Sequence, residues 1–202
     1  MSATEKKILR VTTPVGRLSF PTLFKPRLSK LSGKEQYEAT ILIPKAGSDI
    51  ANLIAAAKTK LEEHWPNATT RPSLAENRGP IKDGDTWIGE NGRKKSDQYP
   101  EMAGCWVIRA SSLNKPPVVN HSLLPITDAS EVYSGCWIRL GLTVFWYDNK
   151  RKGVSFGLVT VQKTKDDSKF GASGNPEDFF DATPNTDTPA PEAAPKGTDI
   201  FS

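Results

Sequence analysis

The chain has 202 residues, of which 37% are hydrophobic, so it can form one domain with a buried core and an appendage. It contains no apolar run near ~20 residues, and Met1–Lys7 lacks the apolar core of a signal peptide. We therefore expect no membrane span and a cytoplasmic location, with Cys105 and Cys136 as reduced thiols.

The formal net charge of +4 is unevenly distributed along the chain. Residues 175–202 hold six acids and one base, a net charge of −5, which leaves 17 acids and 26 bases, a net charge of +9, in residues 1–174. A basic body favours polyanions, and an acidic tail can compete with them. The tail has five prolines and few aliphatic residues, so we predict that it is disordered.

The first part of the chain predicts short strands followed by one helix. Residues 8–20 read as two short strands, residues 20–27 are interrupted by prolines, and Gln36–Ile43 alternates as a strand. Ser48 is a suitable N-cap, and the helix is predicted to end near Trp65. The apolar residues recur at helical spacing and predict a core-facing stripe: Ile50, Leu53, Ile54, Ala57 and Leu61.

A basic, Gly-containing stretch, Asn91–Ser96, follows in a region that reads as loop. It carries three consecutive cations, Arg93, Lys94 and Lys95. Such a loop can close over a nucleic-acid strand, and an exposed loop that merely aids solubility has the same composition.

The densest run of strand-forming residues is Tyr133–Gln162. Within it, Cys136–Tyr147 separates at a period of two into two faces. The first is an ordinary core face: Cys136, Ile138, Leu140, Leu142, Val144 and Trp146. The second mixes aromatic and polar residues: Trp137, Arg139, Gly141, Thr143, Phe145 and Tyr147. The basic turn Asp148–Gly153 then leads into a returning strand, Val154–Val161, and completes a long hairpin.

Two interpretations fit this hairpin. Its aromatic rings can stack on unpaired bases while the cations of the turn follow the phosphates. Alternatively, it is a sandwich strand buried on both faces with a solvated turn.

Many short strands, regular turns and one helix predict a mainly β fold. The leading candidate is a Greek-key barrel like the oligonucleotide/oligosaccharide-binding (OB) fold, with one α-helix and a disordered acidic C-terminal tail. A jelly roll and an immunoglobulin-like sandwich fit the same pattern. We predict that residues 1–170 form the domain and residues 171–202 the flexible tail.

No catalytic, metal or cofactor site is expected. A metal site would need His64, His121, Cys105 and Cys136 to converge without any CxxC or HxxxH pair. The loop at residues 89–96 lacks the second glycine of a phosphate-binding loop before its Lys-Ser pair. The chain is therefore expected not to be an enzyme and to need no cofactor.

Four segments together resemble a family of bacteriophage single-stranded-DNA-binding proteins. They are Gly79–Asp85, Pro117–Asn120, Val132–Cys136 and Lys152–Gln162, and the resemblance extends over residues 8–165. It implies an OB-fold, no catalysis and sequence-tolerant coating of single strands in phage DNA replication, recombination and repair. It also implies that the cytoplasm is that of the host cell.

The tail is similar to those of bacterial and phage single-strand binders, which end in acids and a terminal Phe. Here one acid, Asp199, precedes Ile200 and Phe201, and Ser202 follows them. By this resemblance the tail would regulate DNA binding and recruit phage or host replication and recombination proteins. The sequence leaves open whether the chain forms a homo-oligomer.

The predicted DNA-binding residues come from the hairpin and the basic loop. Trp137, Phe145 and Tyr147 are the stacking candidates. The expected phosphate contacts are Arg139, Lys150, Arg151 and Lys152, with Arg93, Lys94 and Lys95 closing over the strand. Weaker candidates are Phe24, Lys25, Arg27 and Trp106. Two other functions remain open: a single-strand annealing recombination protein, and a phage structural or adaptor β-protein that binds no DNA.

Overall fold

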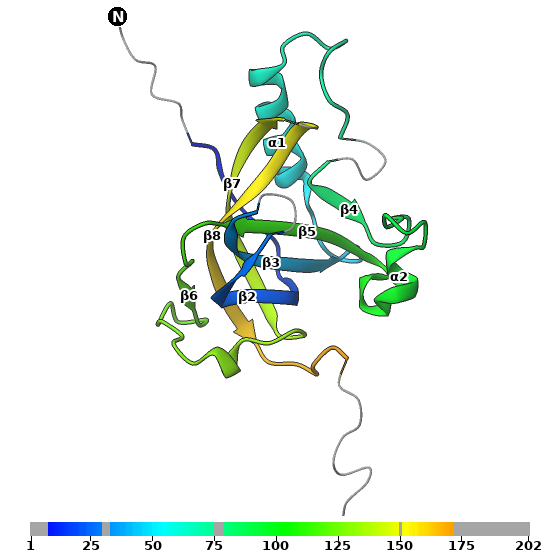
Figure 1. The fold of residues 1–202 in the computed structure, drawn as a ribbon. Helices are drawn as coiled ribbons and strands as arrows, with labels where there is room; N and C mark the ends of the chain where they lie inside the picture. Colours follow the sequence, from blue (N-terminus) through cyan, green and yellow to red (C-terminus); the bar gives the residue numbers. More distant parts are fainter. Residues whose placement is uncertain (1–7, 30–32, 75–78, 150, 172–202) are drawn as a thin grey trace, which may run out of the picture. The chain divides into compact units, whose positions relative to one another are not determined.

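The computed structural model describes residues 8–29, 33–74, 79–149 and 151–171 (Figure 1). Residues through Gly171 form one compact unit. The predictions for Lys150 and for the tail, including Asp199, Ile200 and Phe201, lie outside the described residues. The domain boundary at residue 170 stays a prediction.

The described part of the chain is mainly β. Its eight strands are β1 (Arg10–Thr12), β2 (Gly16–Leu28), β3 (Glu35–Pro44), β4 (Ile81–Asp83), β5 (Cys105–Ser112), β6 (Val118–Val119), β7 (Trp137–Asp148) and β8 (Lys152–Lys165). The main helix is α1 (Ala51–His64), and three single turns of helix are α2 (Lys95–Gln98), η1 (Pro100–Met102) and η2 (Ala129–Glu131). The turn α2 lies in the stretch that was predicted to be loop.

Five of the strands close into a barrel in the order β7-β2-β3-β5-β8, with β8 returning to β7. All of these pairs are antiparallel except β5–β8, where Ala110 lies opposite Phe156 in parallel register. A closed five-stranded Greek-key barrel with one parallel pair is the OB topology, so this prediction is confirmed. The open sandwich alternatives do not fit a sheet that closes on itself.

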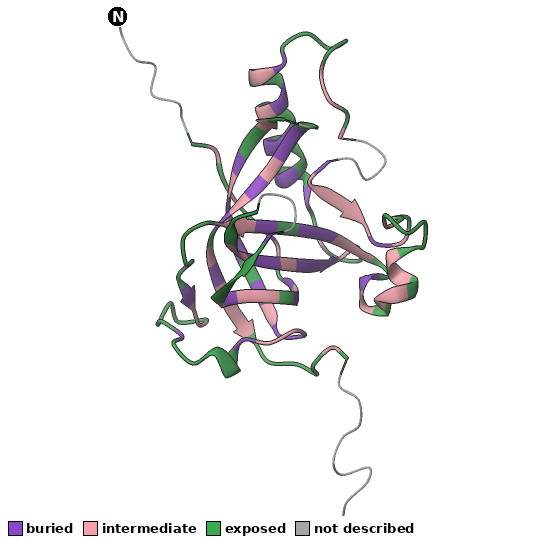
Figure 2. Ribbon diagram, viewed as in Figure 1, coloured by how far each residue is buried: buried purple, intermediate pink, exposed green. Residues whose placement is uncertain are grey.

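The barrel interior holds the core, and β7 contributes to it with the predicted alternation (Figure 2). Ile138, Leu140, Leu142 and Val144 are all at most 4% exposed. Trp146 was placed on the same face, and that prediction is wrong because its side chain is 37% exposed. The strand extends past the end of the barrel there and lies beside α1 instead of over the core.

Helix α1 packs against β1, β7 and β8 through Leu53, Ala57 and Leu61, which are buried as predicted. Ile54 was assigned to the same stripe but is 37% exposed. Ser48 is not the N-cap, since the helix begins at Ala51, whose N–H donates to Asp49 Oδ1 at 2.8 Å.

Candidate nucleic-acid interface

A groove of about 1130 Å³ crosses the outer face of β3 and β5. Its floor carries the residues that alternate with the core positions of these strands: Gln36, Glu38 and Thr40 from β3, and Val107, Arg109 and Ser111 from β5. One wall comes from the β7–β8 hairpin and another from β4 and α2. OB barrels bind oligonucleotides on the face of their second and third strands, which here are β3 and β5, beside the loop that here joins β7 to β8.

The groove is strongly basic. Its lining holds six cationic side chains and, among the described residues, one acid, Glu38. The cations are Arg27, Lys82, Lys95, Arg109, Arg151 and Lys152. A concave surface with cations on every side concentrates positive potential, and this favours a polyanion along the floor.

Four aromatic rings line the same groove: Phe20, Trp87, Tyr99 and Tyr147. The edge of one ring in the pair Phe20–Tyr99 meets the face of the other, with 5.0 Å between centroids. The Lys95 ammonium lies 5.8 Å from the Trp87 ring and 5.5 Å from the Tyr99 ring. Rings interleaved with cations can stack on bases and hold phosphates at the same time.

Phe20 reaches the groove through an unusual backbone conformation. Its φ is +48°, a left-handed value that bulky side chains rarely adopt, and it lies where the β2–β3 register shifts between Ser19 and Thr22. The Phe20 N–H donates to Ser134 Oγ at 3.1 Å, and the side chain is 47% exposed. Strain of this kind persists where surrounding contacts enforce it, and here it turns a large ring outward.

Ion pairs hold in place the groove wall that carries Lys95 and Trp87. Lys45 Nζ binds Asp83 at 2.6 Å and Asp85 at 2.7 Å, which ties the turn after β4 to the end of β3. A Cβ at Gly84 would lie 1.9 Å from the Met102 carbonyl oxygen, so only glycine allows this close approach.

Two groups in the groove have shifted pKa values. Burial lowers the pKa of Lys82, and the positive charge of Arg151 lowers it further. Burial by itself raises the pKa of Glu38, but hydrogen bonds from Gln36 and Arg109 outweigh it and the net pKa is lowered. Glu38 is therefore ionised at neutral pH.

Some of the residues predicted from the sequence line this groove and others do not. Those that do are Lys95, Tyr147, Arg151, Lys152 and the weaker candidate Arg27. Those absent from its lining are Arg93, Lys94, Trp137, Arg139 and Phe145, with the weaker candidates Phe24, Lys25 and Trp106. A DNA-binding role for the second group stays a prediction.

Trp137 instead takes part in a contact cluster at the end of β8. Its Nε1–H donates to Asp167 Oδ2 at 2.6 Å, and Lys165 lies 4.7 Å from its ring. Arg17 joins the cluster by donating to the Ser168 carbonyl at 2.5 Å and by lying 4.4 Å from the Phe170 ring. These contacts hold the segment after β8 against β2 and β7.

Sequence reasoning missed Phe20, Lys82, Trp87, Tyr99 and Arg109. A signal for Arg109 was present, since it alternates with buried positions on β5 and so had to face outward. Trp87 and Tyr99 flank the basic stretch that was singled out. Phe20 had no signal, because its orientation depends on a backbone conformation that a pattern cannot show.

Known proteins resemble this chain in sequence and in fold. The family model described as Enterobacter phage Enc34, ssDNA-binding protein, matches residues 9–189. The chain belongs to this family. A protein named p50 from Acyrthosiphon pisum secondary endosymbiont phage 1 is 33% identical over 174 residues, which is 82% of this chain and 89% of that protein.

Solved structures show the same fold. The single-stranded DNA-binding protein of bacteriophage Enc34, in complex with ssDNA, matches with a TM-score of 0.66 and 26% identity, covering 82% of this chain and 99% of that one. The single-stranded DNA-binding protein gp2.5 of bacteriophage T7 matches with a TM-score of 0.58 over 90% of this chain and 100% of that one. At 12% identity, this second match supports the fold alone. The predicted family resemblance is confirmed.

None of the helices that the structure describes is long and apolar enough to cross a membrane.

Proposed function

We propose that this chain binds single-stranded DNA in the groove across β3 and β5, without sequence preference and without catalysis. The observation that carries the proposal is the lining itself, whose described residues combine six cations and four aromatic rings with a single acid. Membership of the Enc34 family supports it, since the Enc34 protein has been seen in complex with ssDNA.

The two sets of side chains would have separate tasks. Phe20, Trp87, Tyr99 and Tyr147 offer faces on which bases stack, and every base has such a face, so the binding tolerates any sequence. The cations neutralise phosphates and release counterions, which makes the affinity fall with salt. A duplex keeps its bases paired and stacked inside and cannot use the rings.

In the phage life cycle, we infer that the protein coats and protects single strands during DNA replication, recombination and repair. The binding chemistry and the family support this role. Strand annealing is a separate activity, and faster pairing of complementary oligonucleotides in the presence of the protein would reveal it.

The direct test is a titration with oligo(dT), and then with a duplex of equal length, at two salt concentrations. Trp87 lies in the groove and makes intrinsic Trp fluorescence a suitable signal. We expect strong quenching by the single strand, weaker binding at higher salt and a much smaller effect of the duplex. If oligo(dT) neither quenches nor binds, the proposal fails and a structural or adaptor role becomes the better explanation.

We further propose that the acidic tail regulates this binding. The charge of −5 in residues 175–202, against +9 in the rest of the chain, supports competition between the tail and DNA for basic side chains. Truncation after Gly174 should then tighten DNA binding at low salt. Unchanged affinity would leave recruitment of replication and recombination proteins, through Asp199, Ile200 and Phe201, as the role of the tail.

A further inference from the structure

Glu38 is a buried acid in a groove whose other described charged residues are cations. It lies on the groove floor in β3, it is 4% exposed, and it is the one acid among the described residues of the lining. A carboxylate in a phosphate-binding groove repels the ligand, and burying it costs free energy unless it is paired. Its position therefore needs a compensating role.

The carboxylate binds donors from both neighbouring strands. Oε2 accepts from Arg27 Nη2 of β2 at 3.1 Å, and Oε1 accepts from Arg109 Nη2 of β5 at 2.5 Å. Oε1 also accepts from Gln36, and the Glu38 backbone N–H donates to Thr22 Oγ1 at 2.9 Å. Glu38 is thus held in one orientation between two arginines.

The two arginines remain open to the groove. The side chains of Arg27 and Arg109 are 62% and 55% exposed, whereas that of Glu38 is 5% exposed. A guanidinium carries five N–H donors in a rigid plane, so one nitrogen can bind Glu38 while others remain for a second anion. Because the Glu38 carboxylate binds both guanidinium groups, they present these donors to the groove in a fixed arrangement.

We propose that Glu38 is a positioning residue for single-stranded DNA, which holds Arg27 and Arg109 in place for phosphates. This inference rests on the proposed function. Long side chains lose rotamer freedom when they bind a ligand, and a partner that orders them beforehand removes much of that cost. The gain from two ordered arginines has to exceed the repulsion from one buried charge.

Substitution of Glu38 separates this role from simple electrostatics. Glu38→Gln removes a negative charge from a groove that binds a polyanion, so charge alone predicts tighter binding. The amide nitrogen of the glutamine would face one of the two guanidinium groups, donor against donor, and release it. Positioning therefore predicts weaker binding, by about tenfold for the one arginine that loses its order.

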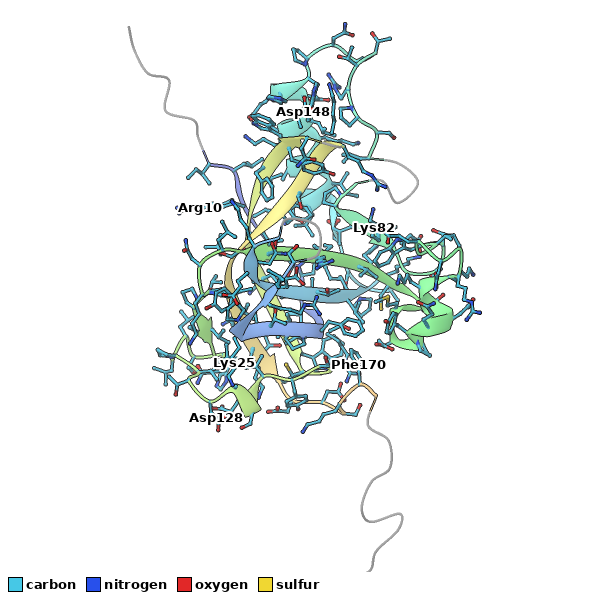
Figure 3. The ribbon with its side chains drawn as sticks, viewed as in Figure 1. Arg10, Lys25, Lys82, Asp128, Asp148 and Phe170 are labelled. Atoms are coloured by element: carbon cyan, nitrogen blue, oxygen red, sulfur yellow. The ribbon has the colours of Figure 1, made fainter. Side chains whose placement is uncertain are left out.

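The measurement is oligo(dT) affinity at two salt concentrations for wild type, E38Q and the control D128N. Asp128 caps η2 by accepting from Ser130 N–H at 2.8 Å, which an asparagine also does, and Figure 3 shows it far from the hairpin residue Asp148. We expect about tenfold weaker binding by E38Q and no weakening by D128N. Equal or tighter binding by E38Q overturns the inference.

Two further variants separate positioning from an effect of charge alone and from misfolding. Glu38→Asp keeps the charge but is one methylene shorter, so positioning predicts weaker binding and charge alone predicts no change. In the R27A/R109A background, E38Q should cause no further loss and only the tighter binding that charge predicts, whereas damage to the barrel would lower affinity in any background. If wild type itself fails to bind oligo(dT), the proposed function fails, and this outcome is distinct from failure of the Glu38 role.

Discussion

The imidazole of His64 lies face to face with the indole of Trp146, with 3.6 Å between ring centroids and 12° between planes. His64 is the last residue of α1, and Trp146 lies two residues before the end of β7. The Trp65 ring completes the cluster, perpendicular to the imidazole with 4.5 Å between ring centroids. The stack therefore supports the hairpin that carries Tyr147 and Lys152 into the groove.

Trp146→Ala should lower both the free energy of unfolding and the DNA affinity. An aromatic pair contributes about 0.5–1.5 kcal/mol beyond its buried area, and the hairpin loses its contact with α1. Urea unfolding and oligo(dT) titration would measure the two effects. A double-mutant cycle with His64→Ala tests the cause, because independent, additive losses would show that the two rings do not act as a pair.

Removal of Phe20 or Tyr99 should weaken binding of single strands by about 1–3 kcal/mol per stacked base. The loss should persist at high salt, because stacking releases no counterions. Phe145→Ala is the matched control for Phe20, since the two are 43% and 47% exposed but Phe145 does not line the groove. An equal loss in this control would favour the face of β7 that the sequence predicted.

Phosphate contacts should appear in the salt dependence of binding. Lys152→Ala should reduce the slope of log affinity against log salt by about 0.7, the value for one phosphate on a single strand. Lys94→Ala removes the same charge from outside the groove lining and should leave the slope unchanged. A change of slope in K94A would instead mean that the loop at residues 93–95 closes over DNA.

Lys82 should give DNA binding an alkaline limit. Burial and Arg151 lower its pKa in the free protein, while a bound phosphate favours the charged form and raises it. The affinity from Lys82 is therefore full below the lowered pKa and is lost as pH rises through the pKa of the complex. Lys82→Arg should bind oligo(dT) with a weaker decline at high pH, because arginine keeps its charge there. Identical profiles for wild type and K82R would contradict this assignment.

The parts of the fold that the sequence could predict depend on local periodicity. The alternation through Ile138 and Val144 identified one strand and its buried face, and helical spacing identified α1. Both signals come from residues close together in the chain that share one apolar surface. The same signal failed at Trp146, because alternation continues where the barrel no longer lies beneath the strand.

The groove could not be predicted in the same way. Arg27, Glu38 and Arg109 meet because β3 pairs with both β2 and β5, and such pairings between distant segments leave no periodic mark. The predicted site was drawn from one hairpin and one loop, each continuous in sequence. Among the groove residues that this prediction missed, Arg109 lies at a cross-strand position and Phe20 depends on a left-handed backbone conformation.

Closure of the barrel also has a consequence for biosynthesis. The first barrel strand, β2, pairs with β7, and the last barrel strand, β8, ends at Lys165. A ribosome must therefore release nearly all of this domain before the ring can close, and pairings across such separations form slowly. The basic residues of a nascent chain are therefore synthesised before the groove can form. Selective binding of single strands should begin only after translation of the domain is complete.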